Sequence, residues 1–497
     1  MKAHTLAAGA ALSLLLLPAS GQQYYQTKTP YQPQQDSASY EAVPPGFQPV
    51  FVQMLARHGS RGLSSFKTDG ALYALWQQAD QENALTPLGH ALGPDLLQMI
   101  RANALLGYGV EGISKPGYGN ETMQGLEEHT GMAQRLLARL PTLFQDAAAQ
   151  QRRIIVDTSG KDRAVDSGEV FSRTLVAQQP ALKPLLVAGT DRYLLYFHKL
   201  PAPTEQTPAA QRPTYDASQA YQRWVKSEAL QNRSAAIYAQ PQIHAAAQAV
   251  LARLFTPAFI AALDAGKRNA VNSASYTFSS ADGKFTTTLK GDDNSSIDSS
   301  TEAAMALYDL YAAAADMHAE LTADFTRYVP PEQARVFAEA EDAVAFYEKG
   351  PGSAGNGDLN WRMANALLAD FFREADAIAA GDHSHAAKLR FAHAEIVIPL
   401  AAALGLPGMS KQTAPGSTYS YKNNSWRGAT VAPMAANLQW EMYQNAAGEF
   451  LVRLLYNERE TDFSAACASA RWQRNSHFYN YSQLKHCYTK TIVKMVE

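Results

Sequence analysis

Two short apolar runs, each ending in a turn of small residues, constrain the fold more than any other feature of the chain. PVFVQML (residues 49–55) leads into ARHGSR, and RRIIV (152–156) leads into DTSGKDR. Each run has the length of a buried strand, and the second precedes the helix-like segment DRAVDSGEVFSRTLVAQ (162–178). Strands that alternate with helices indicate a mainly parallel α/β sheet flanked by helices. Active-site residues of such sheets gather at the carboxyl ends of the strands.

The rest of the chain adds helices and further strands to this pattern. Helix-like segments are expected at 87–105 and 126–140. Strand-like runs return at 389–400 and 449–460.

A change of composition predicts an inserted domain. Between 214 and 350 alanine-rich helical stretches dominate, and 275–290 alternates around Asp-Gly as a β-hairpin does. We therefore predict an α/β core formed by 47–213 and 351–497, interrupted by a mainly helical cap at 214–350. The Gln-, Tyr- and Pro-rich residues 22–46 are expected to form an extended lead-in.

The first 21 residues have the three parts of a secretory signal peptide. Lys2 supplies the positive start, an apolar run follows to Pro18, and Ala19-Ser20-Gly21 suits cleavage. A membrane anchor is the alternative, but the run is short for a span of about 20 residues. We therefore expect an exported protein, periplasmic or secreted, that leaves the membrane once the signal is removed.

The only two cysteines, Cys467 and Cys487, are expected to pair. In an exported chain such an isolated pair is most simply a disulfide. The net charge is −3, from 43 basic and 46 acidic side chains. This balance gives no sign of a nucleic-acid partner, so an anionic ligand must be held by a local cluster of positive charge.

Arginines on both sides of a histidine make ARHGSR (56–61) the first candidate site. A strand that ends in such a turn can lead into a helix, whose first N–H groups favour an anion. Arg57 and Arg61 add planar donors that suit tetrahedral oxyanions. Their positive field keeps His58 unprotonated, which leaves a nucleophile facing a phosphate-binding pocket. A surface Arg-His pair on a loop is the alternative, and the preceding buried strand argues against it.

Arg163 is the second candidate, because it falls in the first turn of the helix predicted after the 152–156 strand. Ser159 and Asp162 resemble a capping box, which predicts that this helix starts near Gly160. An arginine in the first turn opposes the helix dipole unless an anion compensates it. We expect Arg163 either to bind the anion or to form a structural salt bridge.

The third candidate is FAHAEIVIPL (391–400), interpreted as a strand. His393 and Glu395 are two residues apart, so both are predicted to point to one face. His393 would donate to a phosphate oxygen, and Glu395 would protonate the departing alkoxide, a step worth about 10²–10⁴-fold in rate. His383 and His385 lie nearby, but no third ligand stands at a recognisable spacing, so we expect no metal site.

These motifs together resemble a known family. RHGSR (57–61), TSGKDRAVDS (158–167) and HAE (393–395), in this order, resemble the histidine phosphatase superfamily in its acid-phosphatase and phytase branch. His-Ala-Glu is similar to multiple inositol polyphosphate phosphatases, whereas His-Asp is typical of ordinary acid phosphatases and one group of phytases. Further similar segments are LTPLGH (85–90), EEHTGMAQRLLARLPTLF (127–144), FYEKGPG (346–352), AANLQWEMY (435–443) and VRLLYNERE (452–460). The resemblance covers most of the chain and is weakest across 200–345.

The resemblance implies a phosphatase that needs no metal or other cofactor, in which His58 becomes a phosphohistidine. His393 would add a donor, and Glu395 would protonate the leaving oxygen and then help to activate water. The phosphoryl oxygens would be bound by three arginines: Arg57, Arg61 and Arg163.

One departure from the family concerns the loop after the second arginine. The family usually has x-Pro-Thr there, and this chain has Gly62-Leu63-Ser64, so the loop is expected to differ. Lys67, close to the position of a substrate-contacting lysine in relatives, and Lys161 are expected to bind a second phosphate.

The sequence therefore predicts an exported, monomeric phosphomonoesterase that hydrolyses myo-inositol hexakisphosphate (phytate) and related inositol polyphosphates. A broad-specificity histidine acid phosphatase is the alternative, and only the His-Ala-Glu motif separates the two. A non-catalytic anion-binding protein is another alternative, since phosphate capture needs the arginines but not His58 or Glu395. A phosphomutase would use the same chemistry, but export and the large cap favour hydrolysis. An acidic working range is expected, because a carboxyl with a pKa of about 4–5 carries its proton at low pH.

Overall fold

The computed structural model describes residues 23–492. The predicted signal peptide (1–21) lies outside the described residues. Within them, no helix combines the length and the apolar character that crossing a membrane requires.

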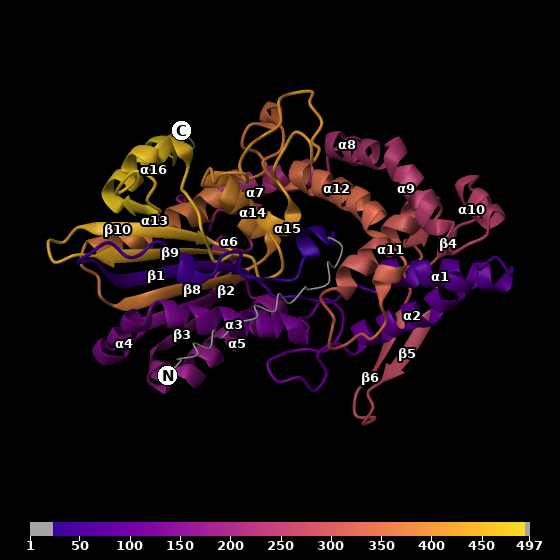
Figure 1. Ribbon diagram of the computed structural model, residues 1–497, viewed down its shortest axis with the longest axis horizontal. Helices are drawn as coiled ribbons and strands as arrows, with labels where there is room; N and C mark the ends of the chain where they lie inside the picture. Colours follow the sequence, from indigo (N-terminus) through magenta and orange to yellow (C-terminus); the bar gives the residue numbers. More distant parts are fainter. Residues whose placement is uncertain (1–22, 493–497) are drawn as a thin grey trace, which may run out of the picture.

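A mixed sheet forms the centre of one half of the molecule (Figure 1). Its strands are β1 (Gln48–Arg57), β2 (Arg153–Thr158), β3 (Leu186–Thr190), β8 (His385–Ala392), β9 (Asn437–Gln444), β10 (Phe450–Tyr456), β11 (Arg459–Glu460) and β12 (Phe478–Asn480). Their order is β11-β10-β9-β1-β8-β2-β3, and β12 pairs with β10. Strands β1, β8, β2 and β3 are parallel neighbours. Strand β9 is antiparallel to β1, and β10 is antiparallel to β9. The predicted α/β fold with parallel core strands is confirmed.

Helices cover both faces of the sheet (Figure 1). On one face lie α3 (Met123–Arg139), α4 (Pro141–Gln150) and α5 (Asp162–Gln178). On the other lie α7 (Arg212–Val225), α13 (Asn365–Ala379), α14 (Ala394–Ala403) and α16 (Tyr481–Ile492). Because both faces are covered, every residue of β8 is buried, as is typical of a parallel strand.

The second half of the molecule is a helical body with its own hydrophobic core (Figure 1). Its helices are α1 (Thr68–Gln81), α2 (Pro87–Ala104), α8 (Glu228–Tyr238), α9 (Pro241–Leu251), α10 (Pro257–Asp264), α11 (Ser300–Ala314) and α12 (Pro331–Glu348). The predicted hairpin is present as β5 (Ser275–Ser279) and β6 (Thr286–Lys290), next to the short pair β4 (Ala270–Val271) and β7 (Ser296–Ile297). Since α1 and α2 precede residue 214, the helical body is built from two segments of the chain.

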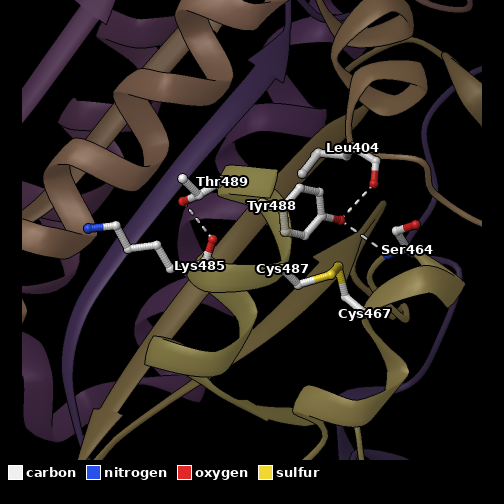
Figure 2. The surroundings of a disulfide bond; sticks show 7 residues. All are labelled: Leu404, Ser464, Cys467, Lys485, Cys487, Tyr488 and Thr489. Carbon is white, nitrogen blue, oxygen red and sulfur yellow. Dashed lines mark hydrogen bonds between the residues drawn. A yellow bond between two sulfur atoms is a disulfide. The ribbon is translucent and has the colours of Figure 1, made fainter. Parts of the chain in front are cut away.

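The predicted disulfide between Cys467 and Cys487 is confirmed. It fastens α16 beside the sheet (Figure 2). The Tyr488 hydroxyl assists, since it donates to the Leu404 carbonyl at 2.6 Å and accepts from the Ser464 N–H at 3.1 Å. The C-terminal helix is therefore held by a covalent bond and by hydrogen bonds.

The prediction that 389–400 is one strand is wrong. Strand β8 ends at Ala392, and α14 begins two residues later at Ala394. A continuous apolar run fits a buried strand and a buried helix equally well, so periodicity alone could not locate this boundary.

Candidate active site

His58 follows directly on strand β1 at the carboxyl edge of the sheet. Its backbone N–H donates to the Ala392 carbonyl at 3.0 Å, which extends the pairing of β1 with β8 by one step. Its ring Nδ1 lies 2.9 Å from the Gly59 carbonyl oxygen. Since a carbonyl only accepts, Nδ1 carries the proton and the lone pair stands on Nε2. Burial, followed by the charges of Arg163 and Arg57, lowers the pKa of His58 well below its usual value.

Three arginines surround this imidazole. Arg57 ends β1, and its guanidinium donates to the carbonyls of Thr27 and Ala432 at 2.5 and 2.7 Å. Burial, together with Arg61, lowers the pKa of Arg57 to about 10. Burial and Arg61 also lower the pKa of Arg163, which lies in the first turn of α5. The three arginines thus act electrostatically on His58, and Arg61 acts on the other two.

The cluster has donors that no group of the protein satisfies. Within residues 23–492, the buried Nε–H groups of Arg57, Arg61 and Arg163 and the Nδ1 of His393 have no hydrogen-bond partner. A buried polar group without a partner costs about 1–3 kcal/mol, and three neighbouring positive charges repel one another. An oxyanion would relieve both costs by accepting charge-assisted hydrogen bonds.

His393 and Glu395 stand at the junction of a strand and a helix, and the prediction that they share a strand face is wrong. His393 is the N-cap residue of α14, and Glu395 lies in its first turn. The His393 ring nonetheless lies 5.5 Å from the His58 ring, centroid to centroid. Both residues reach the same edge because β8 ends beside β1.

The predicted capping box at the start of α5 is also wrong. The helix begins at Asp162, with Lys161 as an N-cap residue that makes no side-chain cap. The Ser159 hydroxyl instead lies 2.8 Å from Nε2 of His393. This serine fixes the orientation of the imidazole, a contact between distant segments that a local motif cannot reveal.

Glu395 has a cationic partner that the sequence did not predict. The Lys349 ammonium, just after α12, donates to Glu395 Oε1 at 3.0 Å. Burial alone would raise the pKa of Glu395, but Lys349, His198 and His393 hold it well below its usual value. Burial would lower the pKa of Lys349, yet Glu395 and Glu348 raise it. The contact with Lys349 therefore favours the ionised form of the carboxyl.

Buried carboxyl groups bind the loop that follows His58. The Gly59 N–H donates to Glu121 at 2.5 Å, and burial raises the pKa of Glu121 to about 8. The Ser60 hydroxyl lies 2.7 Å from Glu128 and 2.9 Å from Asp316 of the helical body. Sequence reasoning missed these residues, because carboxyls far apart in the chain give no local signal.

The loop after Arg61 replaces the family's proline with a hydrogen bond. The Leu63 N–H donates to the side-chain oxygen of Asn103 at 2.7 Å, a bond that a proline could not make. The neighbouring Gly62 N–H donates to the Asn120 carbonyl at 3.2 Å. Helix α2 thus anchors the loop that Gly62-Leu63-Ser64 forms.

The two lysines predicted to bind a second phosphate lie in different surroundings. Lys67 forms an ion pair with Asp292 at 2.8 Å, its side chain is 56% exposed, and no described contact joins it to the arginine cluster. The Lys161 ammonium lies 5.5 Å from the ring centroid of Tyr196, whose ring packs against His393. Tyr196 thus links Lys161 to His393, and binding of a second phosphate stays a prediction for both lysines.

One of the two histidines considered for a metal, His385, has a carboxylate partner instead. His385 lies in β8, with Nε2 at 3.0 Å from Glu374 Oε2. Among the described residues, no group of three His, Cys, Asp or Glu side chains could hold a metal ion.

Comparisons with known proteins show the family and the fold of this chain. The model of the histidine phosphatase superfamily (branch 2) matches residues 50–457. The multiple inositol polyphosphate phosphatase of Bifidobacterium longum, in complex with inositol hexasulfate, is 33% identical with a TM-score of 0.82, covering 94% of this chain and 97% of that chain. The same enzyme in complex with phosphate is 32% identical to this chain, with a TM-score of 0.83. The match covers 95% of this chain and 98% of that chain. The phytase from D. castellii shares the fold, with a TM-score of 0.61 at 13% identity. The match covers 94% of this chain and 84% of that chain. A search of curated proteins gave no match.

Proposed function

The chain belongs to the histidine phosphatase superfamily (branch 2), and from this membership we propose that it is a phosphomonoesterase whose nucleophile is His58. The observation that carries the proposal is the His58 imidazole, which holds its proton on Nδ1 through the Gly59 carbonyl and lies among three arginines. Its Nε2 lone pair is thus available for attack on a phosphoryl group bound by the guanidinium groups.

In the first step, Nε2 of His58 bonds to phosphorus while the ester P–O bond breaks. The arginines stabilise the charge on the non-bridging oxygens as it redistributes, and His393 supplies a further donor through Nδ1. Glu395 gives a proton to the departing oxygen, so that an alcohol leaves. The product of this step is the phosphohistidine.

In the second step, water loses a proton to Glu395 and attacks phosphorus, and the P–N bond breaks. Inorganic phosphate leaves, and Glu395 regains the proton it gave in the first step. His58 returns to its starting tautomer, because Nδ1 keeps its proton throughout and donates it in a hydrogen bond to the Gly59 carbonyl.

We propose inositol polyphosphates, phytate among them, as the substrates. Support comes from the His-Ala-Glu motif and from the likeness over the whole chain to the Bifidobacterium longum enzyme, whose name states that substrate class. A broad-specificity acid phosphatase is the rival. Measuring kcat/KM on phytate and on p-nitrophenyl phosphate separates them, since equal or better use of the aryl ester would contradict the phytase assignment.

A His58→Ala variant tests the mechanism. It should lose turnover while keeping its circular dichroism spectrum, and ³²P-labelled substrate should leave acid-labile label on the wild-type protein alone. Turnover by the variant would contradict the covalent mechanism. A folded wild-type protein that binds phosphate without hydrolysing any ester would instead be the non-catalytic anion binder.

We also propose that the protein is exported and monomeric. The signal-like first 21 residues and the disulfide support export. N-terminal sequencing of protein recovered outside the cytoplasm should begin near residue 22, and light scattering should report the mass of one chain.

A further inference from the structure

The contact between Lys349 and Glu395 opposes the chemistry proposed for Glu395. A general acid must carry a proton when the leaving oxygen departs. An ammonium 3.0 Å from Oε1 favours the ionised carboxylate instead. Either another residue donates the proton, or Lys349 must leave Glu395 during the reaction.

Lys349 is placed so that it can leave. It follows the last residue of α12, its side chain is 18% exposed, and a second carboxylate, Glu348, lies 3.6 Å from its Nζ. Its flexible stem lets the ammonium exchange one oxyanion for another. The other charged or titratable groups that act on Glu395 or Lys349 are Arg57, Arg163, His198, Tyr221, Glu341 and His393.

We propose that Lys349 makes the enzyme selective for substrates with several phosphates, because a phosphate next to the scissile ester draws the ammonium away from Glu395. The freed carboxylate takes up one proton from water, which the first chemical step then transfers to the leaving oxygen. A substrate with a single phosphate has that phosphate bound by the arginines. It has none left for Lys349, so Glu395 stays ionised.

This proposal rests on the proposed function, and three substrates test the two separately. p-Nitrophenyl phosphate has a leaving group that departs without a proton, so its first chemical step depends on His58 and the arginines and needs no proton from Glu395. Inositol monophosphate needs the proton but has one phosphate. Phytate needs the proton and has neighbouring phosphates.

In the wild type we expect kcat to fall on the alkaline side at a higher pH for phytate than for inositol monophosphate. In Lys349→Met, loss of the ammonium lets Glu395 keep its proton to higher pH. The kcat for inositol monophosphate should then rise about tenfold near neutrality, part of the 10²–10⁴-fold that a general acid supplies. The kcat/KM for phytate should fall about tenfold. The kcat/KM for p-nitrophenyl phosphate, which covers only the steps up to release of nitrophenolate, should stay within about threefold, which also shows that the variant folds.

Glu348→Gln is the matched control. It removes the other carboxylate beside Lys349, and the ratio of phytate to monophosphate turnover should stay within about threefold of wild type. A proportional loss on all three substrates in Lys349→Met would show a structural role and overturn the proposal. Coinciding wild-type pH profiles would overturn it without any variant. Activity that survives His58→Ala would remove the proposed function together with this proposal.

Discussion

Replacing Gly125 with alanine tests whether the nucleophile loop must lie directly on helix α3. Gly125 is in the first turn of α3. A Cβ at this position would lie 2.4 Å from the Ser60 carbonyl oxygen and 2.9 Å from the Ser60 backbone nitrogen. Ordinary contact begins near 3.4 Å, so the loop and the helix would have to separate by about 1 Å. Both atoms are backbone, so no side chain can rotate away.

A shift of that size next to His58 should be costly. Misplacing a catalytic group by about 1 Å costs roughly 10²-fold in rate, and we expect that loss in kcat for p-nitrophenyl phosphate. Circular dichroism and thermal unfolding would show that the variant remains folded. A folded Gly125→Ala variant with kcat within about threefold of wild type would refute the argument.

Gly131→Ala is the control on the same helix. Its Cβ would meet only the far end of the Arg135 side chain, which can move. Activity should be unchanged, and unfolding should become harder by about 0.5–1 kcal/mol, the usual gain of alanine over glycine inside a helix. The two variants differ in position alone, so the contrast isolates the contact with the loop.

Three further predictions follow from the described contacts. Burial and the arginines keep the pKa of His58 well below its usual value. The kcat/KM for p-nitrophenyl phosphate should therefore stay level from about pH 7 to about pH 5.5. A fall centred near pH 6.5, the usual pKa of histidine, would contradict this. Leu63→Pro removes the N–H that donates a hydrogen bond to the Asn103 side-chain oxygen, and it should lower the free energy of unfolding by about 1–3 kcal/mol in urea titrations. An unchanged midpoint of unfolding would show that this hydrogen bond contributes nothing. Replacing both Cys467 and Cys487 with serine should lower the free energy of unfolding by about 3 kcal/mol in the same titration and leave kcat unchanged. A loss of kcat without a loss of stability would contradict a structural role of the disulfide.

The parts of the site that lie at strand ends could be predicted from the sequence. Arg57 pairs with Ala392 and Thr158 with Phe391, so β1, β2 and β8 end at nearly the same level of the sheet. Any residue just after these strands therefore reaches one edge, whichever element carries it. For this reason His393 and Glu395 reach the edge of the sheet where His58 lies, although they belong to the start of helix α14 and not to the predicted strand.

The groups that tune this chemistry could not be predicted. Lys349 and Glu395 are 46 residues apart, and Ser60 and Asp316 are 256 apart. Only the packing of the helical body against the sheet brings such pairs together, and no local pattern encodes it. Lys349 did stand in a segment that resembles the family, FYEKGPG, but the segment gives no hint of which carboxylate its ammonium would meet.

The position of Glu395 on a helix also changes what its protonation depends on. The first turn of α14 and the ammonium of Lys349 both favour the carboxylate. The guanidinium groups act in the same direction, since Arg57 and Arg163 each interact electrostatically with Glu395. A bound polyanion counteracts all of these charges at once, so the substrate itself supplies the field in which Glu395 can hold a proton. On this view Glu395 is protonated only when a substrate with several phosphates is bound, and specificity depends on this protonation as much as on binding.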